Sequence, residues 1–355
     1  MDIATLTQIL EIAFEKRVSD IHFEVDNPPI FRARGHLIHS KLSKLTPKDT
    51  EFIASTVMEQ HGKKLPDQLM EFDTSYNLSN VGRFRVSIFR QKGNIGLVMR
   101  VIPHYIGTFE ELNLPPVLGD ITKSPNGLIL VCGPTGNGKS TTLASMLRYI
   151  NDNFNHSVIT IEDPIEYIFP SNKSCIIQRE VGIDTESFAG ALKASMRMDP
   201  DVIMVGEMRD LETIDACIKA AETGHLVLST LHTHSAVSTI NRIVGYFPSQ
   251  NQENIRHRLA EILVATISLR LVRAKNGEVV LPAMEVMSAT SSIKACIRDN
   301  HLEEIEQYIE KGRDEYHMQT LDQHLIQLCR QEIITLDEAK RTSRSTDLER
   351  KLIYS

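Results

Sequence analysis

The spacing of apolar residues predicts that the first hundred residues form a mixed module of helices and strands. Apolar side chains recur at helical intervals over residues 3–16. Thr46 and Pro47 are typical of a helix start, and this second helix is expected to run to about residue 60. Strands are predicted at residues 20–25, 30–34, 72–78, 83–89 and 97–102.

From Gly127 onward, predicted strands alternate with helices, which indicates a mostly parallel sheet flanked by helices. We therefore expect an amino-terminal domain over 1–104, a linker over 105–118 and a second α/β domain over 119–355, with a helical tail from about residue 289. Tail helices are predicted at 291–299, 302–311, 320–331 and 335–343, the last two opened by the capping boxes Thr320–Gln323 and Thr335–Glu338.

Composition places the chain among ordinary globular proteins, with 41% hydrophobic and 24% charged residues. The net charge of −7 supplies no basic field that would attract nucleic acid or an anionic membrane, so no nucleic-acid partner is expected. Five scattered cysteines without a C-x-x-C pair suggest a reducing cytoplasm rather than disulfides or zinc. The amino terminus lacks signal-peptide features, and no apolar run approaches the ~20 residues of a membrane span, so membrane contact is expected to be peripheral.

The most informative stretch is GPTGNGKST, residues 133–141, which matches the phosphate-binding loop G-x-x-x-x-G-K-[ST]. An apolar run, 127–132, precedes it and a helix-compatible run follows, which is the context that the motif requires. Such a loop binds phosphate through inward-pointing backbone N–H groups and a helix N-terminus. We expect Lys139 to contact the β- and γ-phosphates and Ser140 to ligate Mg²⁺. The other expected contacts to nucleotide are Gly133, Pro134, Thr135, Gly136, Asn137, Gly138 and Thr141.

Two acidic segments follow predicted strands. The run 158–161 ends in Glu162, Asp163 and Glu166, and Pro164 is expected to turn these carboxylates toward the carboxyl end of the strand. The second run, 201–205, is followed by Glu207, the Walker B pattern with Glu in place of Asp. A solvated acidic turn is the bland alternative for the first segment. After a phosphate loop, both segments predict Mg²⁺ ligation and activation of water.

A histidine-rich segment flanks a third apolar strand, with His225 before it and His232 and His234 after it. If the strand persists, His232 and His234 share one face, but no cysteine or acid stands at zinc-ligand spacing. A structural hydrogen bond is the bland interpretation of an isolated histidine. Here a γ-phosphate sensor or a relay at the strand end is favoured.

The segment 82–103 carries five cations and no acid, at Arg83, Arg85, Arg90, Lys92 and Arg100. Alternation places the first two arginines on one face of a strand and Phe84, Val86 and Ile88 on the core face. A solvated face is the bland interpretation, yet cations without partners in an acidic chain need an anion. The nucleotide of a neighbouring subunit would supply one, which predicts a ring or stack with ATP between protomers.

These elements, in this order, resemble the PilT-type retraction ATPases of bacterial type IV pili, within the secretion ATPase superfamily. The resemblance covers nearly the whole chain. It rests on residues 19–22, 82–89, 133–142, 159–169 (the family's Asp box), 178–180, 199–214, 220–233 (the His box) and 317–322.

The resemblance implies a fold, roles and partners. The implied fold is a PAS-like α+β amino-terminal domain followed by a RecA-like P-loop ATPase domain with a helical tail, assembled as a homohexamer. Glu166 is the implied general base, Glu207 the Walker B carboxylate and a ligand of Mg²⁺ with Ser140, and His225 and His232 the His-box residues. Arg83, Arg85 and Arg100 match the arginines that reach the nucleotide.

The implied function is ATP hydrolysis that withdraws pilin through a platform protein of the inner membrane, with the ATPase peripheral on the cytoplasmic side. The sequence shows neither the additional amino-terminal domain nor the four-cysteine module usual in assembly and secretion relatives, which favours retraction. Asn137 replaces a more usual Ser, and the late A-I-R-x-x-I-R-E motif appears as residues 292–299 with altered residues. An accessory pilus ATPase, a type IV secretion ATPase, a RecA-like nucleic-acid translocase and a non-catalytic nucleotide-binding scaffold are the alternatives.

Overall fold

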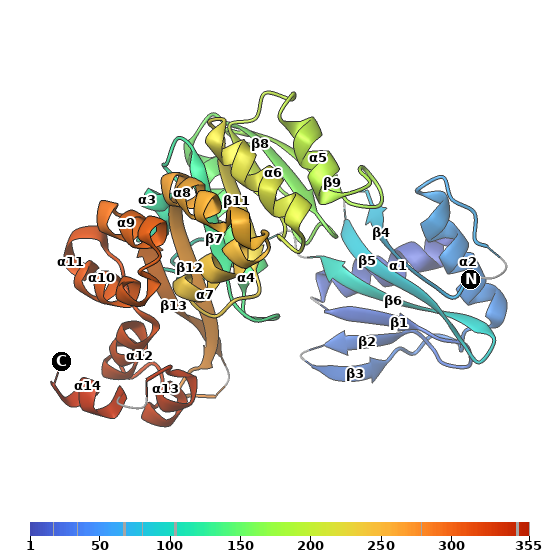
Figure 1. Cartoon of the computed structure of the whole chain (residues 1–355). Helices are drawn as coiled ribbons and strands as arrows, with labels where there is room; N and C mark the ends of the chain where they lie inside the picture. Colours follow the sequence, from blue (N-terminus) through green and yellow to red (C-terminus); the bar gives the residue numbers. More distant parts are fainter. Residues whose placement is uncertain are drawn as a thin grey trace. The chain divides into compact units, whose positions relative to one another are not determined.

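The computed structural model describes residues 1–16, 18–33, 35–66, 69–79, 81–102, 105–277, 279–345 and 348–354, with the side chains of 351, 353 and 354 excepted. The chain divides into two compact units (Figure 1). Unit 1 comprises Met1–Tyr105 and Pro164–Ile168, and unit 2 comprises Ile106–Asp163 and Phe169–Ser355. Residue 34 of a predicted strand and residues 103 and 104 at the predicted domain boundary lie outside the described residues.

Unit 1 is built on a six-stranded antiparallel sheet of order β3-β2-β1-β6-β5-β4. Its strands are β1 (Asp20–Phe23), β2 (Ile30–Ala33), β3 (His36–His39), β4 (Glu71–Leu78), β5 (Gly82–Gln91) and β6 (Asn94–Ile102). Helices α1 (Ile3–Glu15) and α2 (Pro47–Glu59) share one hydrophobic core with the sheet. In β5, Phe84, Val86 and Ile88 are fully buried, which confirms the predicted core face.

The strand β3 was not predicted. All four of its residues are exposed, so the alternation of buried and exposed positions that reveals a strand is absent. Backbone pairing to β2 forms it instead, with Ile30 opposite His39 and Ala33 opposite His36. The strand is the edge of its sheet.

Unit 2 contains a seven-stranded sheet of order β13-β12-β7-β11-β10-β8-β9. Every pair except β12–β13 is parallel, which confirms the predicted mostly parallel sheet. The strands are β7 (Gly127–Cys132), β8 (Ser157–Glu162), β9 (Cys175–Glu180), β10 (Val202–Val205), β11 (Leu226–Leu231), β12 (Leu263–Arg273) and β13 (Val280–Ser288). Because β7, β8, β10 and β11 are parallel neighbours, the residues after each of them meet at one edge.

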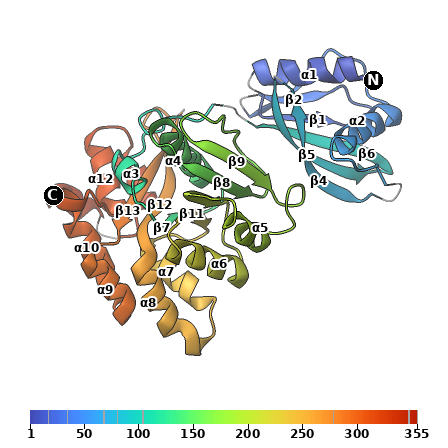
Figure 2. The same ribbon diagram turned by 90° about the horizontal axis from the view of Figure 1, so that it is seen from above.

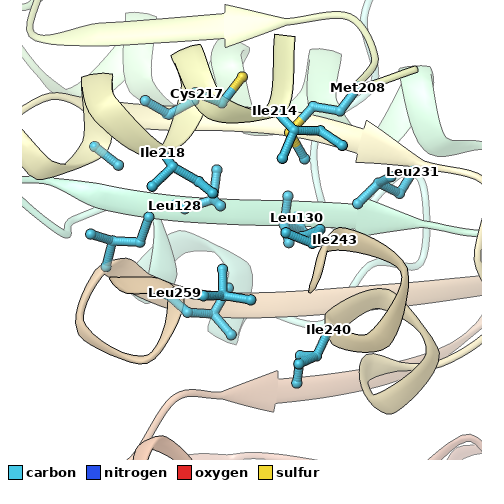
Figure 3. Packing of buried hydrophobic residues seen from close by; sticks show 14 of the residues in the cluster. Leu128, Leu130, Met208, Ile214, Cys217, Ile218, Leu231, Ile240, Ile243 and Leu259 are labelled. Atoms are coloured by element: carbon cyan, nitrogen blue, oxygen red, sulfur yellow. The ribbon is translucent and has the colours of Figure 1, made fainter. Parts of the chain in front are cut away.

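Helices cover both faces of this sheet (Figure 2). One face carries α5 (Phe188–Ser195), α6 (Leu211–Glu222), α7 (Ala236–Gly245) and α8 (Gln252–Ile262). The short helix η1 (Ser249–Asn251) directly precedes α8 in the chain. The other face carries α3 (Val117–Ile121) and α4 (Lys139–Asn153). Leu128 and Leu130 of β7 pack against Ile214, Ile218 and Leu259 of the first group (Figure 3). All six residues of β7 are buried, as expected for the centre of a covered parallel sheet.

The tail is helical, as predicted, but it has more segments than expected. They are α9 (Ser291–Asp299), η2 (Leu302–Glu304), α10 (Ile305–Lys311), α11 (Arg313–Tyr316), α12 (Leu321–Arg330), α13 (Leu336–Thr342) and α14 (Leu348–Tyr354). The Thr320–Gln323 capping box is confirmed. At α13 the Thr335 hydroxyl accepts from the Glu338 N–H, but the carboxylate of Glu338 accepts from the Arg273 N–H and pairs with Arg341, so this box is only half formed.

The segment predicted as a linker, 105–118, packs on α4 over much of its length. Ser145 donates to the carbonyl of Gly107 at 2.8 Å, and the guanidinium of Arg148 donates to the carbonyl of Ile106. The rings of Phe109 and Tyr149 stack with centroids 5.3 Å apart. The domain boundaries themselves stay predictions. No helix among the described residues combines the length and apolar composition needed to cross a membrane.

Candidate functional site

The phosphate loop joins β7 to α4, as its sequence context predicts. Two glycines are required by the backbone. Gly133 has φ 149°, and a Cβ there would lie 2.7 Å from the carbonyl oxygen of Leu269. Gly138 is the N-cap of α4 with φ 85°, in the left-handed region that glycine adopts without strain. The loop therefore closes tightly and ends on a helix N-terminus, where backbone N–H groups and the helix dipole favour an anion.

Lys139 is the first residue of α4, and only 8% of it is exposed. Its ammonium donates to the carbonyl oxygens of Gly133 at 2.9 Å and Pro134 at 3.1 Å. It also lies 3.4 Å from Nδ1 of His232. The positive charge of Lys139 is thus held inside the phosphate loop, next to the loop backbone.

Asn137 ties the tip of the loop to the neighbouring strand. Its Oδ1 accepts from the N–H of Leu271 in β12 at 2.9 Å, and its Nδ2 donates to the carbonyl of Thr135 at 3.3 Å. A serine side chain is shorter and carries no amide. The hydrogen bond from the Leu271 N–H of β12 therefore depends on asparagine at position 137.

The other predicted loop residues lie around Lys139. The hydroxyl of Thr135 is 3.4 Å from Nδ1 of His232, and Gly136 has φ 77°. Ser140 and Thr141 occupy the first turn of α4 and are half-buried. Their hydroxyl groups are therefore close to the helix N-terminus.

Glu207 lies just beyond β10, and 13% of its side chain is exposed. One carboxylate oxygen, Oε1, pairs with the guanidinium of Arg209, and the other, Oε2, is 3.3 Å from Nε2 of His232. The backbone around it is fixed to β11, since the hydroxyl of Thr230 donates to the carbonyl of Gly206 and the N–H of Met208 donates to that of Thr230. Glu207 and His232, which follow the neighbouring strands β10 and β11, therefore lie close together at one edge of the sheet.

His232 joins these two groups. Because an ammonium only donates, Nδ1 of His232 is the acceptor toward Lys139, and Nε2 carries the hydrogen directed at Glu207. This assignment follows from the hydrogen-bond network. It gives a neutral ring that connects the phosphate loop with the carboxylate.

His225 lies at the end of β11 opposite to the phosphate loop of its own chain, and its predicted contact with nucleotide stays a prediction. It precedes β11 while His232 follows it, which separates the two by roughly 20 Å at the rise of a β-strand. Its Nδ1 lies 3.0 Å from the carbonyl oxygen of Ala220, in the last turn of α6, and 3.2 Å from the hydroxyl of Thr223. The His225 side chain therefore caps the carboxyl end of α6.

His234 does not share a strand face with His232, because β11 ends at Leu231 and the chain turns into α7. Within the described ranges, no cluster of His, Cys, Asp or Glu side chains could hold a metal ion by itself. Cys132, directly before the loop, is buried, and this burial raises the pKa of its thiol to about 11. Cys132 therefore stays protonated, and its sulfur accepts from the hydroxyl of Thr239 at 3.2 Å.

The three carboxylates after β8 differ in their surroundings. Glu162 ends the strand and is 6% exposed, and its Oε1 accepts from the hydroxyl of Thr160 at 2.6 Å and from Nε2 of Gln178 at 3.1 Å. Asp163 and Glu166 are exposed in the following loop. By its contacts, Glu166 is grouped with unit 1.

Arg83, Arg85 and Arg100 lie on the sheet face away from the helices of unit 1. Arg85 stands between Ser75 and Arg100 in the strand register, and Arg100 stands opposite Asp20. The expectation that these cations have no partners is wrong for Arg100, since its Nε donates to Asp20 at 2.9 Å. Arg83 donates to the hydroxyl of Ser75 at 2.9 Å, and Arg90 donates to backbone carbonyls. Arg85 is exposed beside Arg100, and two adjacent like charges favour an anion nearby.

Comparison with known proteins decides the family. The family model "Type II/IV secretion system protein" matches residues 2–352. The chain belongs to this family. It is 40% identical to the type IV pilus retraction ATPase PilT of Pseudomonas aeruginosa, over 96% of this chain and 98% of that protein. It is 41% identical to a twitching motility protein of Neisseria gonorrhoeae, over 90% of this chain and 85% of that protein.

A solved structure agrees with the sequence comparisons. The crystal structure of the pilus retraction motor PilT with bound ADP matches with a TM-score of 0.89 at 44% identity, covering 97% of this chain and 99% of that one. The likeness extends over both units. The PAS-like and RecA-like architecture that the sequence predicted is therefore the fold of this family member.

Several residues around the site escaped sequence analysis. Arg209 pairs with Glu207, and Gln178 contacts both Glu162 and the backbone of Phe169. Arg344, from the tail, pairs with the buried Glu285 and donates to the carbonyl of His234. For Arg209 the proximity to Glu207 in sequence was a usable signal. The other contacts join distant segments through single polar residues, which leave no periodic pattern.

Proposed function

We propose that this chain is a Mg²⁺-dependent ATPase whose homohexamer powers type IV pilus retraction. One observation supports it best. A phosphate loop, a histidine and a strand-end carboxylate are connected from Lys139 through His232 to Glu207. The chain carrying this connection is 40% identical to a pilus retraction ATPase over nearly its full length.

The loop supplies the grip on the triphosphate. On binding, phosphate oxygens replace the carbonyl groups of Gly133 and Pro134 as acceptors of the Lys139 ammonium. The backbone from Gly133 to Thr141 then surrounds the β-phosphate, with the first turn of α4 directed at it.

The oxygen donors Ser140 and Glu207 suit Mg²⁺, which prefers hard ligands and retains several waters. When bound, Mg²⁺ would supply positive charge that neutralises the charge developing in the transition state. Glu207 would hold the hydrated ion through Oε1, the atom that pairs with the guanidinium of Arg209 in this structure. His232 holds Oε2 in place and senses the γ-phosphate beside Lys139.

Glu166 is the proposed general base that takes a proton from the attacking water. Its position in the loop after β8 suits a carboxylate at the carboxyl edge of a parallel sheet. Arg83, Arg85 and Arg100, from the same or a neighbouring subunit, neutralise the transferring phosphoryl group. Such arginines contribute about 10³–10⁵ in rate. A nucleotide-bound structure of the assembly would test this, because at least one of the three should contact phosphate in closed subunits.

The motor cycle couples closure to hydrolysis. Residues 1–104 and 119–355 are the proposed moving domains, with the joint near 105–118. Nucleotide must favour the closed arrangement by roughly 5 kcal/mol to populate it almost fully. Charge-assisted hydrogen bonds of about 1.5–3 kcal/mol each supply this amount. Successive closures turn a platform protein of the inner membrane, which withdraws pilin, while the ATPase stays peripheral on the cytoplasmic side.

A cell assay tests this function. A deletion strain should lose twitching and carry excess surface pili, and the wild-type gene should restore withdrawal. The Lys139→Ala gene should not restore it. Bald deletion cells would contradict retraction and indicate pilus assembly, and unchanged pili with lost protein export would indicate a secretion ATPase. Turnover stimulated by DNA would favour a nucleic-acid translocase.

A further inference from the structure

One side chain, that of Gln178, bonds to the residues on both sides of the segment that carries Glu166. Residues 163–174, between β8 and β9, contain neither helix nor strand, so no backbone ladder holds them. Gln178 lies on the adjacent strand β9, opposite Thr160 of β8. Its side-chain amide reaches both ends of the segment 163–168.

We propose that Gln178 is a positioning residue that sets the location of Glu166 by closing the base of this loop. The inference rests on the proposed role of Glu166 as general base. Nε2 of Gln178 donates to Oε1 of Glu162 at 3.1 Å, and its Oε1 accepts from the N–H of Phe169 at 2.9 Å. Glu162 precedes the loop and Phe169 follows it, and both belong to unit 2 together with Gln178.

The two residues that Gln178 connects, Glu162 and Phe169, are both buried. Glu162 is 6% exposed and Phe169 is 7% exposed. A buried carboxylate needs hydrogen-bond donors, and the hydroxyl of Thr160 donates to the same Oε1 at 2.6 Å. The side chain of Phe169 is buried, and this burial fixes the backbone whose N–H donates to Gln178.

The chemistry of the contact requires an amide. Glu162 accepts and Phe169 donates, so the residue between them must donate at one atom and accept at another. Glutamate would accept from Phe169 but would place a second carboxylate beside Glu162. Methionine has similar length and shape but makes neither bond.

A second amide, near the amino-terminal ends of β8 and β9, provides a matched comparison. Nδ2 of Asn151, in α4, donates to the carbonyl of Pro170 at 2.8 Å, and its Oδ1 accepts from the N–H of Asn172 at 3.0 Å. It therefore makes two bonds of similar length to the backbone just beyond Phe169. Asn151 is 6% exposed, so its replacement disturbs packing to a comparable degree.

The test compares Gln178→Met with Asn151→Leu in the full-length protein. For Gln178→Met we expect kcat for ATP to fall about 10- to 100-fold with KM within about 2-fold, because small displacements of a reacting group cost rate rather than binding. For Asn151→Leu we expect kcat within about 2-fold of wild type, at a similar loss of melting temperature. Equal losses of kcat in both variants would overturn the proposal.

A double-mutant comparison with Glu166→Gln separates positioning from general structure. If Gln178 acts through Glu166, adding Gln178→Met to Glu166→Gln lowers kcat by no more than about 2-fold. A full multiplicative loss would overturn the proposal. If Gln178→Met does not fold, Gln178→Glu takes its place in the same comparison, and amide exchange at Phe169 should stay protected in it. A Glu166→Gln variant with wild-type activity would refute the role of Glu166 itself, which is a distinguishable result.

Discussion

Nε2 of His232 lies 3.3 Å from Oε2 of Glu207, so residues just beyond the ends of two neighbouring parallel strands are directly connected. The opposite nitrogen of the same ring faces the ammonium of Lys139. A neutral imidazole is suited to this place because it accepts at one nitrogen and donates at the other. In the function proposed above, this connection would let the carboxylate respond to phosphate bound at the lysine.

Replacing this ring should slow hydrolysis more than it weakens binding. We expect His232→Ala to lower kcat by about 10²-fold, the usual effect of removing one aligned polar group from a reacting site. Affinity for ATP should change little because Lys139 and the loop backbone remain. His234→Ala is the matched control, since that residue is an exposed histidine in the turn beyond the strand, and its activity should stay near wild type. Equal effects of the two substitutions on phosphate release would contradict the relay.

Asn137 should contribute separately to stability and to binding. Asn137→Ser removes the acceptor for the Leu271 N–H, which should lower stability by about 1 kcal/mol in thermal melts without nucleotide. Asn137→Asp keeps an acceptor but adds negative charge beside the bound phosphates. It should therefore melt near wild type and bind ATP more weakly. If both variants melt alike, the bond to β12 is not the reason for asparagine here.

An ion pair joins the tail to β13. Arg344 pairs with Glu285, which is 3% exposed and also accepts from the N–H of Ala236, the first residue of α7. Removing the partner of a buried charge is costly, so Arg344→Ala should lower the free energy of unfolding by roughly 3 kcal/mol or more. Arg341→Ala removes a guanidinium that is 64% exposed, and its partner Glu338 keeps the Arg273 N–H as a donor, so this change should cost less than about 1 kcal/mol. Urea unfolding of both variants measures the difference, and equal values would contradict a buried role for Glu285.

Acid should destabilise the tail through His324. Burial lowers the pKa of this imidazole from 6.5 to about 4, and its Nδ1 accepts from the N–H of Met284 at 2.9 Å, which requires the unprotonated form. The unfolded chain therefore binds a proton between pH 6.5 and 4 that the folded chain does not. Stability from this group is complete above pH 6.5 and falls by roughly 3 kcal/mol as the pH drops to about 4. In urea titrations, His324→Gln should show a shallower pH dependence over this window, and identical slopes would contradict the assignment.

The parts of the fold that follow from local rules were predictable. The glycines of the loop stand within one short stretch because the backbone there needs left-handed conformations, and the faces of β5 follow from strict alternation. The strand β3 has no buried face, so periodicity could not reveal it. Arg100 was expected to lack a partner because Asp20 lies 80 positions away in the chain. His225 and His232 look equivalent in sequence, and only strand direction separates them.

ATP turnover by the purified full-length chain tests the central claim most directly. We expect the wild-type protein to release phosphate from ATP only with Mg²⁺ present. Lys139→Ala should retain less than about a hundredth of that rate, because it lacks the ammonium that we propose contacts the transferring phosphate. A Lys139→Ala protein that hydrolyses ATP at the wild-type rate would contradict the account.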